Sequence, residues 1–443
     1  MNELLTEVLA AREQRAQKQK QLLEQYKKPL ICFTMNIPGP KKLDRDVSIG
    51  FFVGNRMLAD AIGPKALLHF EQQRLITGCE AYYVVDLPAR ELKRLTADIE
   101  DSHPSARLFD MDVLDTDGSK LERQALGLPR RQCLLCDKDA VICASSRAHP
   151  LEQLQDRTGF LLYLAARQLF AEYIGAQAYM ALHREVNTTP KPGLVDRNNR
   201  GAHRDMDLRH FFASAIALRP YMTKCAETGY LTRDDAPGKT FRDIRPLGKE
   251  AEQTMLSATH GINTHKGAIF SMGILCAAAG RLDPAQWTPE RLLEECAAMT
   301  AGVTRQDLGR ITAENAVTPG ERLYALYGIT GVRGQAEAGF PAVGQTGLPV
   351  LRQGLAQGLS MNDAGCAALL HLLAATDDTN LIHRSDRQTQ LEVRKKIAQL
   401  LEQSPFPSQE QILALDREFI QRNLSPGGTA DLLAMTYLLD ALT

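Results

Sequence analysis

The sequence contains no uninterrupted apolar run close to the roughly 20 residues that a membrane-spanning helix needs. Its N-terminal segment, MNELLTEVLAAREQRAQKQKQ, also lacks the apolar stretch of a secretory signal peptide. Neither sign of charge dominates: 52 Lys and Arg stand against 53 Asp and Glu, and a net charge of −1 gives no general attraction to nucleic acid. The nine cysteines are an odd number and stand mostly in apolar runs, which favours reduced thiols. These absences predict a soluble, cytoplasmic protein without membrane or nucleic-acid partners, whose anion sites are local.

The chain is long enough, at 443 residues, for two or three domains with cores of their own. It begins with a polar, charged helix, 1–27, which we expect to dock on the first domain. Short β-branched or aromatic runs bounded by Pro or Gly predict strands at 30–36, 79–87 and 107–114. A helical segment, 53–75, is expected between the first two strands.

After residue 150 the strand signals stop. Apolar residues recur at helical spacing in later segments: 151–183, 207–230, 266–280, 289–302, 361–376, 387–403, 408–422 and 429–442. We therefore expect a multidomain fold, in which an α+β domain is followed by a larger all-α domain. The boundary is expected between residues 150 and 172, and we divide the chain into domains of residues 1–160 and 161–443.

A pair of aspartates lies in the third predicted strand. Residues two apart on a strand project to the same side, so Asp110 and Asp112 would face one way. Two carboxylates on one face can hold Mg²⁺, which commonly bridges to substrate phosphates. His103 and Arg107, just upstream, are candidates to bind a departing pyrophosphate, Arg107 through its bidentate guanidinium. The alternative is an acidic strand edge that faces solvent.

Three cysteines and a histidine in the first domain have the spacing C-x2-C-x6-C-x5-H: Cys133, Cys136, Cys143 and His149. This spacing permits a tetrahedral zinc site, and Arg130 and Arg131 could offset the thiolate charge. Leu134 and Leu135, between the first two cysteines, instead suggest a buried hydrophobic turn with inert thiols. The second interpretation is favoured, because zinc knuckles usually carry a second tight pair of ligands.

The most informative stretch is residues 183–207, HREVNTTPKPGLVDRNNRGAHRDMD, which interrupts an otherwise helical half. Its two prolines and two glycines exclude a regular helix. Long polar loops in compact domains are more often functional than decorative, although a solvated crossover between helices is the plainer interpretation. The loop carries side chains that suit phosphate binding, metal binding or proton transfer: Lys191, Asp196, Asn199, His203, Arg204 and Asp205.

Two helix starts that contain glycine add further candidates. In GINTHKG, His265 and Lys266 fall in the first turn, where free backbone amides and the helix dipole favour an anion. In SPGGTADLL, Gly427 and Gly428 allow a ligand to approach the backbone, and Asp431 could hold a metal ion or accept a proton. The alternative for each is an ordinary capped helix.

Two shorter motifs complete the inventory of the second half. Residues 331–341, GVRGQAEAGFP, contribute Arg333, and residues 377–380, DDTN, with Arg384 form a polar patch at a helix end. The half thus contains carboxylates for Mg²⁺, cations for a polyphosphate and groups for proton transfer, which are the parts of a nucleoside triphosphate site. No Walker-type G-x4-GK[ST] and no kinase signature is present, which argues against a familiar ATPase.

These motifs resemble two enzymes that build the prosthetic group of citrate lyase. The second half is similar to triphosphoribosyl-dephospho-CoA synthase along essentially its full length, through EVNTTPKPGLVDRNNRGAHRDM, GINTHKGAIFSMGILCAAAGRL, TGVRGQAEAGFP, DDTN with Arg384, and RNLSPGGTADLLA. The first half resembles apo-citrate lyase phosphoribosyl-dephospho-CoA transferase, through FTMNIPGPKK, HPSARLFDMDVLD and RRQCLLCDKDAVICA. The chain looks like a fusion of the two.

The resemblance implies two consecutive reactions. In the helical domain, ATP and 3′-dephospho-CoA would give 2′-(5″-triphosphoribosyl)-3′-dephospho-CoA and free adenine. In the first domain, whose fold would be nucleotidyltransferase-like, that product would be transferred to a serine of the citrate lyase acyl carrier protein, the gamma subunit, with release of pyrophosphate. Mg²⁺ is the expected metal ion.

The expected site residues form three groups. Catalytic roles are expected for Asp110, Asp112, Arg107, His203, His265 and Asp205. Contacts with ATP or dephospho-CoA are expected for Lys191, Asn199, Lys266, Arg333, Gly427 and Gly428. Metal ligation is expected for Asp110, Asp112, Asp196 and Asp431.

Two other functions stay open at this point. The same chemistry could serve a carrier subunit of malonate decarboxylase, because the motifs do not encode the contacts with the acceptor protein. A non-catalytic helical chaperone of a carrier protein would use the loops as a docking face. The density of Lys, His and Asp in Gly- and Pro-containing loops argues against that second reading.

Overall fold

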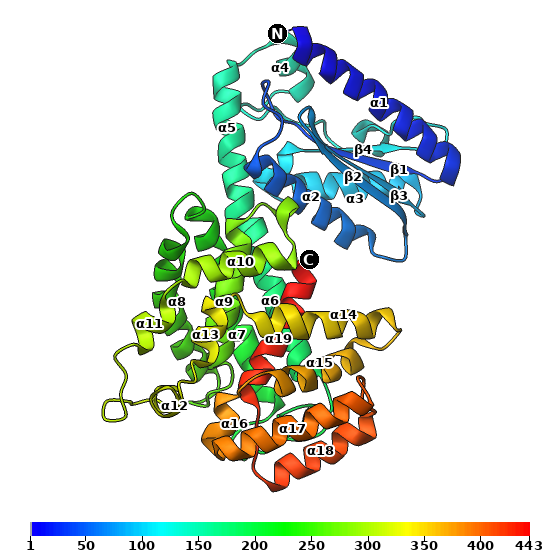
Figure 1. The fold of residues 1–443 in the computed structure, drawn as a ribbon. Coiled ribbons are helices and arrows are strands. Elements are labelled where there is room, and N and C mark those ends of the chain that lie inside the picture. The colour runs from blue at the N-terminus through cyan, green and yellow to red at the C-terminus, as the bar shows by residue number, and fades with distance from the viewer. Residues whose placement is uncertain (1) are drawn as a thin grey trace. The chain divides into compact units, whose positions relative to one another are not determined.

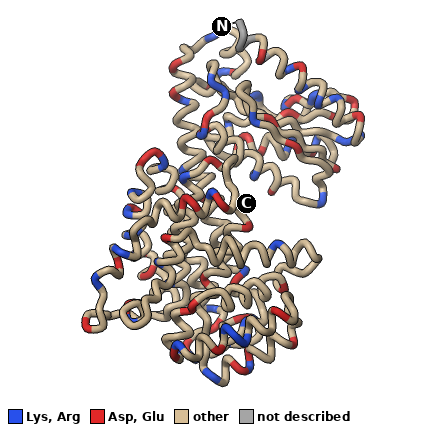
Figure 2. The backbone as a smooth tube through the Cα atoms, viewed as in Figure 1, with Lys and Arg blue, Asp and Glu red and all other residues tan. Residues whose placement is uncertain are grey.

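In the computed structural model the chain is described over residues 2–443, apart from the side chains of residues 2–5 and 8. It divides into two compact units: Met1–Phe170 with Asp283–Ala285, and Ala171–Leu282 with Gln286–Thr443 (Figure 1). Charged residues of both signs are interspersed along both units (Figure 2). Among the described residues no helix combines the length and the apolar character needed to cross a membrane. The expected order of an α+β part followed by a larger all-α part is confirmed.

Unit 1 is built on one antiparallel sheet with the strand order β2-β3-β1-β4. The strands are β1 (Leu30–Met35), β2 (Leu67–Leu75), β3 (Gly78–Val85) and β4 (Phe109–Leu114). The three predicted strands are therefore confirmed. The helical elements of this unit are α1 (Asn2–Tyr26), α2 (Arg45–Ile62), α3 (Ala89–Asp101), η1 (Pro104–Leu108), η2 (Arg123–Leu126), α4 (Ala140–Ser146), α5 (Leu151–Leu164) and the π-helical η3 (Ala165–Phe170).

The two faces of the sheet are covered by different helices. On one face Phe33 of β1 stacks on Phe51 of α2, with ring centroids 5.1 Å apart. On the other face Leu22 and Leu23, near the end of α1, pack in a cluster that includes Cys32. Burial of these apolar side chains holds α1 on the sheet, which confirms the expected docking of the N-terminal helix.

The prediction of one helix over residues 53–75 was wrong. Helix α2 ends at Ile62, where Gly63 adopts φ +73°, and the chain returns as strand β2. Burial along β2 alternates between half-buried and exposed residues at its start, because this strand is the sheet edge and pairs only with β3. An edge strand that buries one face weakly lacks the apolar run by which central strands are recognised.

Unit 2 contains no strand among its described residues, which confirms the all-α expectation. Its elements are α6 (Ala171–Asn187), α7 (Leu208–Leu231), α8 (Pro237–Ala258), α9 (Lys266–Arg281), η4 (Pro284–Gln286, which spans the division), α10 (Pro289–Thr300), α11 (Val303–Leu308), α12 (Pro319–Tyr327), α13 (Gly331–Glu337), η5 (Val343–Gly347), α14 (Leu348–Ala356), α15 (Met361–Ala375), α16 (Thr379–Arg384), α17 (Arg387–Gln403), α18 (Gln409–Gln421) and α19 (Gly427–Leu442). Each helix expected after residue 150 is present, whereas α8, α11 to α14 and α16 were not predicted.

Two apolar helices, α9 and α19, lie at the centre of unit 2. Helix α9 packs against α6, α7, α8 and α19, and almost every residue after its first turn is buried. The approach of α7 and α9 is close, because a Cβ at Gly229 would lie 2.0 Å from the carbonyl oxygen of Ala277. In both α9 and α19, the side chain of the N-cap residue accepts no hydrogen bond from the first backbone amides of the helix. The starts of both helices border the same cavity.

Candidate active sites

A cavity of about 840 Å³ in unit 2 brings the predicted motifs together. Residues that line it come from five segments: 185–211, 263–271, 327–341, 375–394 and 425–432. The loop of residues 183–207, both glycine-containing helix starts, the GVRGQAEAGFP segment and the DDTN patch all contribute. Its volume is in the range of small-molecule sites. Segments that are up to about 240 residues apart in the sequence thus form one polar cavity.

Asp196 organises the loop of residues 183–207. Its Oδ1 accepts hydrogen bonds from the backbone amides of Asn198 (2.7 Å) and Asn199 (3.1 Å). Its Oδ2 accepts from the Thr189 hydroxyl (2.8 Å) and the Lys191 amide (2.9 Å). Asp196 is buried and is not among the residues that line the cavity. Its expected role as a metal ligand stays a prediction, and its hydrogen bonds favour a structural role.

Asn199 also connects the loop to the rest of the unit. Its Nδ2 donates to Asp416 (2.7 Å), which accepts from the amide of Gly193 as well (2.9 Å). Gly193 adopts φ +70°, and a Cβ there would lie 2.1 Å from the carbonyl oxygen of Leu424. Only glycine fits this close approach. Asn199 therefore helps to form the wall that carries the other residues and does not line the cavity itself.

Lys191 and Glu185 form a buried ion pair at the cavity. The Lys191 ammonium contacts the Glu185 carboxylate and donates to the Glu185 carbonyl oxygen (2.8 Å). Burial raises the pKa of Glu185, and the charge of Lys191 opposes that rise. Glu185 therefore compensates the charge of Lys191, so that the ammonium can stay buried at the cavity wall.

His203 connects three of the segments. Its Nε2 lies 2.7 Å from the hydroxyl of Ser425, and its Nδ1 lies 3.4 Å from the guanidinium of Arg384. Arg384 also donates to the carbonyl oxygens of Ala202 (2.6 Å) and Asn423 (3.3 Å). Burial, followed by the charge of Arg384, lowers the pKa of His203. The imidazole is therefore kept in its neutral form, and because a guanidinium can only donate, Nε2 carries the hydrogen and donates to the Ser425 hydroxyl.

His265 lies at the cavity wall and has one unpartnered nitrogen. Its Nδ1 lies 2.7 Å from the hydroxyl of Ser214, whereas its Nε2 is buried with no hydrogen-bond partner among the described residues. Burial, with a smaller contribution from the charge of Lys191, lowers the pKa of His265 to about 3. A buried polar atom without a partner is costly. His265 lines the cavity, so a small movement of a neighbouring group would bring its Nε2 into contact with a bound ligand.

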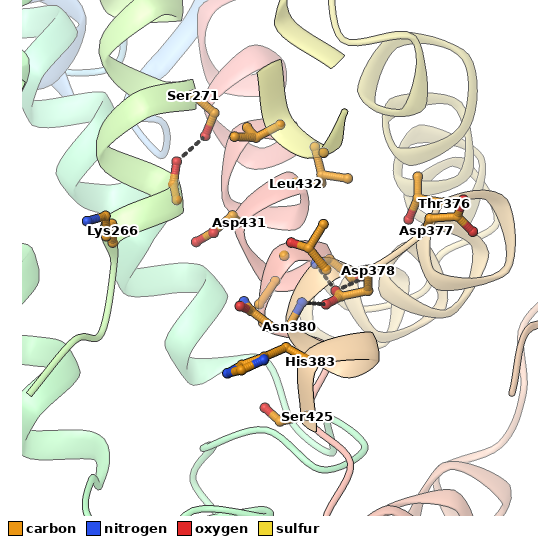
Figure 3. A pocket seen from close by; sticks show the side chains of 18 of the residues that line it. Lys266, Ser271, Thr376, Asp377, Asp378, Asn380, His383, Ser425, Asp431 and Leu432 are labelled. Carbon is orange, nitrogen blue, oxygen red and sulfur yellow. Dashed lines mark hydrogen bonds between the residues drawn. The ribbon is translucent and has the colours of Figure 1, made fainter. Parts of the chain in front are cut away.

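Asp378 joins the DDTN patch to the start of α19. Its Oδ2 accepts from the amide and the hydroxyl of Thr429 (2.6 and 2.8 Å), and its Oδ1 accepts from the amides of Asn380 and Leu381 (2.9 and 3.0 Å). Figure 3 shows Asp378, Asn380 and Asp431 beside one another at this helix start. Gly427 and Gly428 line the cavity at the same place. With its oxygens occupied, Asp378 positions the helix start.

Asp431 extends from α19 to the start of α9. A Cβ at Gly267 would lie 1.9 Å from its Oδ2, so a larger residue there would displace the Asp431 carboxyl group. Burial raises the pKa of Asp431 well above its usual range, and the charges of Glu185 and Asp378 raise it further, while the Ala268 amide opposes the rise. A carboxyl group with two like-charged neighbours favours a bound proton or a bound cation.

The other expected residues of unit 2 lie at the rim or outside the cavity. Asp205 and Lys266 line its mouth, and the ammonium of Lys266 pairs with Glu252 (2.9 Å). Arg333 pairs with Asp307 (2.9 Å) and is not among the lining residues. The expected contact of Arg333 with a nucleotide stays a prediction.

Sequence reasoning missed several lining residues. Ser214 was missed as well, because one hydroxyl within an apolar helix gives no signal; it is buried behind the cavity wall and contacts His265. His383 lines the cavity from α16, and Arg387 does so from the start of α17. Arg387 lies over the ring of Tyr327, with 5.1 Å between the guanidinium carbon and the ring centroid. The position of His383 directly before Arg384 is the one signal that could have identified it.

In unit 1 the two aspartates share one face of β4, the other edge strand of the sheet. Asp110 lies 3.3 Å from the guanidinium of Arg131, and Asp112 lies 2.8 Å from the ammonium of Lys120. Burial, followed by the charge of Asp112, raises the pKa of Asp110. Burial acts to lower the pKa of Lys120, but the hydrogen bond and the charge of Asp112 raise it. The cations Arg131 and Lys120 were not predicted for this site.

Arg107 faces the following loop. Its guanidinium donates to the carbonyl oxygens of Gln132 (3.0 Å) and Cys133 (2.6 Å). Arg131 in turn donates to the carbonyl oxygens of Arg107 and Phe109 (both 2.7 Å). Arg107 therefore contacts the segment beside the aspartates, and its expected contact with phosphate stays a prediction.

The cysteine segment is a less apolar turn than expected, although Cys133 and Cys143 are buried, and the expectation of inert thiols stays a prediction. Leu134 and Leu135 are only half-buried, and the ligand atoms of the three cysteines and the histidine lie within 4.8 Å of one another. The two arginines do not face the thiols, because Arg130 pairs with Asp139 (3.0 Å) and Arg131 with Asp110.

Comparisons with known proteins agree with the two-part organisation. Residues 171–443 match the family described as ATP:dephospho-CoA triphosphoribosyl transferase. Residues 3–162 match the family described as apo-citrate lyase phosphoribosyl-dephospho-CoA transferase. The chain is 36% identical over 447 residues to Protein CitXG of Haemophilus influenzae, covering 98% of this chain and 95% of that protein.

Two further relatives extend this result. Protein CitXG of Leuconostoc mesenteroides is 33% identical over 458 residues, covering 99% of this chain and 97% of that protein. The 2-(5″-triphosphoribosyl)-3′-dephosphocoenzyme-A synthase of Pectobacterium atrosepticum is 41% identical over 291 residues, covering 63% of this chain and 95% of that protein. The resemblance inferred from the motifs is confirmed.

Proposed function

We propose how the two units act from the premise that the chain belongs to the CitXG family, in which an apo-citrate lyase phosphoribosyl-dephospho-CoA transferase is joined to an ATP:dephospho-CoA triphosphoribosyl transferase. The chain is a bifunctional transferase that makes and attaches the prosthetic group of citrate lyase. The two alternative functions, a non-catalytic chaperone of a carrier protein and service to malonate decarboxylase, are not favoured.

The cavity of unit 2 is our proposed site for ATP and 3′-dephospho-CoA. The observation that carries this proposal is the convergence of all five predicted motifs on one cavity of about 840 Å³. The starts of α9 and α19 border it, and helix starts favour the negative charge of a phosphate chain. Lys266, Arg384 and Arg387 at its wall add positive charge.

Asp431 is the residue that we propose to hold Mg²⁺ in this cavity. The raised pKa of Asp431, with its two like-charged neighbours, fits a group that a cation would stabilise in its ionised form. Mg²⁺ is commonly held by one or two carboxylates together with substrate phosphates. When bound, the ion would neutralise charge on the triphosphate.

Two histidines are suited to proton handling in the glycosyl transfer. That reaction breaks the bond between ribose and adenine and joins the ribose carbon to a hydroxyl of dephospho-CoA. His203, kept neutral, can take part in moving the proton of the acceptor hydroxyl through the Ser425 hydroxyl, to which its Nε2 donates. His265 can receive a hydrogen bond from Ser214 at Nδ1 and then donates from Nε2 to the ligand.

For unit 1 we propose a nucleotidyltransferase-like reaction at the aspartate pair. Asp110 and Asp112 would hold Mg²⁺, and the elevated pKa of Asp110 beside a like charge fits such a site. Arg131 and Lys120 lie where they can contact the phosphates. The acceptor would be a serine of the citrate lyase acyl carrier protein, its gamma subunit, and pyrophosphate would be released.

The proposal for unit 2 is tested by incubating the protein with ATP, dephospho-CoA and Mg²⁺ and measuring free adenine by chromatography. We expect adenine only when both substrates are present, in a one-to-one ratio with the modified dephospho-CoA. If no adenine forms, glycosyl transfer in this cavity is excluded. Adding the apo acyl carrier protein is then expected to release pyrophosphate.

The titration of His265 predicts how the stability of unit 2 depends on pH. Its pKa falls from about 6.5 in the unfolded chain to about 3 in the folded one, so between these values only the unfolded chain binds the proton. The contribution to the free energy of unfolding is complete above pH 6.5 and is lost as the pH falls. The native protein is expected to lose about 2 kcal/mol more than His265→Gln between pH 7 and pH 5.

Urea unfolding at the two pH values, followed by circular dichroism, measures this difference. The matched control is His371→Gln, whose Nε2 contacts only the carbonyl oxygen of Pro405 in the described structure. It should retain the native pH dependence. The same loss of stability in native protein and His265→Gln would contradict the buried, neutral state of His265.

A further inference from the structure

We infer that Cys133, Cys136, Cys143 and His149 bind one structural Zn²⁺ ion in unit 1. This is the group of His, Cys, Asp and Glu side chains that the described residues bring close enough to hold a metal ion. Three thiolates and one imidazole are ligands that zinc prefers, and a closed set of four is typical of structural sites.

The distances between the ligand atoms fit a tetrahedral ion. Zinc–sulfur bonds of about 2.3 Å and zinc–nitrogen bonds of about 2.0 Å place ligand atoms about 3.5–3.8 Å apart. The Sγ atoms of Cys136 and Cys143 are 3.6 Å apart, and the Cys136 Sγ lies 3.3 Å from the His149 Nε2. The widest pair is within 4.8 Å. A small adjustment of one side chain would therefore complete the tetrahedron.

The backbone between residues 131 and 140 holds the first two ligands. The Cys133 amide donates to the carbonyl oxygen of Lys138 (2.8 Å), and the Ala140 amide donates to that of Arg131 (2.9 Å). The loop so closed contains Cys136, and the Leu135 amide lies 3.5 Å from the Cys133 Sγ. Amides directed at a cysteine sulfur stabilise its thiolate form.

The other two ligands are held by α4 and the turn that follows it. The Asp139 side chain accepts from the Val141 amide (2.8 Å) and caps the helix that carries Cys143. Arg147 ends the helix in a left-handed conformation, and the Ala148 amide donates to the Cys143 carbonyl oxygen (3.0 Å). This turn directs the chain back to His149.

Apart from these hydrogen bonds, the segment buries little apolar surface that could hold its conformation. Between residues 124 and 150 the only buried residues are Cys133 and Cys143, and the apolar side chains of Val141 and Ile142 are exposed. A segment that buries so little apolar surface normally needs a cross-link or a metal ion to fold. Zinc bound by its four side chains would supply that stability.

The segment is joined to the aspartate pair. Arg131, which precedes the first cysteine, contacts Asp110, and Arg107 donates to the Cys133 carbonyl oxygen. The metal ion would thus position Arg131 and Arg107 beside the aspartates without touching the substrate. Loss of zinc is expected to impair transfer in unit 1 and to leave unit 2 unchanged.

Metal analysis of the full chain, purified without a metal-binding tag, tests the inference. We expect about one zinc ion per chain in the native protein and in Cys79→Ser, a control whose thiol is buried elsewhere in unit 1. Cys136→Ser is expected to lose the zinc. Replacement by Co²⁺ is expected to give the visible d–d bands and the sulfur-to-metal charge-transfer absorption of a tetrahedral sulfur-rich site, a signal that does not require any variant to fold.

Activity provides a second measurement. Cys136→Ser is expected to lose up to about 100-fold in transfer, as small misplacements of active-site groups do, with adenine formation unchanged. The inference is overturned if the native protein contains no stoichiometric zinc and gives no Co²⁺ spectrum. It is also overturned if Cys136 and Cys143 form a disulfide. Metal content does not depend on the proposed reactions, so the two proposals can fail separately.

Discussion

Asp431→Asn is expected to lower kcat/KM for adenine formation by roughly 100-fold or more while making unit 2 more stable. The loss follows from removing the charge proposed to hold Mg²⁺ on the triphosphate, a change in preorganised electrostatics. The gain follows from the raised pKa of Asp431, caused by burial and by the charges of Glu185 and Asp378. Asparagine is isosteric and uncharged, so it removes the cost of placing this carboxyl group there.

The sign of the stability change depends on pH. A carboxyl group whose pKa is raised on folding favours the folded state below its unfolded pKa of about 3.9, and this contribution is lost as the pH rises. At neutral pH the Asp431→Asn variant should therefore melt at a higher temperature than the native protein. A gain of about 1 kcal/mol corresponds to roughly 2–4 °C for a unit of this size. At pH 4 the difference should be smaller.

Asp440→Asn is the matched control on the same helix. Asp440 lies near the other end of α19 and pairs with Arg352 (2.9 Å) outside the cavity. It should keep full adenine formation, because a partly exposed ion pair contributes little. Unchanged activity in Asp431→Asn would rule out its proposed role. A variant that lost both activity and thermal stability would assign Asp431 to the fold instead.

The cavity illustrates how far a sequence can predict a site. Proline and glycine mark the loop and the helix starts because backbone geometry depends on them locally, so the segments could be identified one by one. The direction of each side chain depends on the other segments. Asp196 and Asp431 look equivalent in the sequence. In the structure both oxygens of Asp196 accept hydrogen bonds from the loop, whereas Asp431 lines the cavity.

In unit 1, too, the sequence predicts local features of the site but not the residues that distant segments bring to it. The spacing of Asp110 and Asp112 predicts their common face, because alternation is a property of the strand itself. Their cationic neighbours, Arg131 and Lys120, come from segments without regular periodicity. The sheet edge at β2 was missed for a related reason, because a strand that is exposed on one side and paired on one side has little hydrophobic pattern.

Asp112→Asn is expected to reduce pyrophosphate release on transfer to the acyl carrier protein by roughly 100-fold or more and to leave adenine formation unchanged. The expected loss is chemical, because the variant removes one of two carboxylates proposed to hold Mg²⁺. The fold should persist, because the ion pair with Lys120 is partly exposed and contributes about 0–1 kcal/mol. The measurement uses purified triphosphoribosyl-dephospho-CoA, so that unit 1 does not depend on the output of unit 2.

Asp117→Asn, in the exposed turn after β4, is the matched control, since its carboxylate accepts only from the nearby Ser119. It should retain both reactions. Full transfer activity in Asp112→Asn would exclude that residue from the proposed metal site. Loss of both reactions would contradict two independent active sites, because the only change lies on a strand of unit 1 and every residue lining the adenine-forming cavity belongs to unit 2.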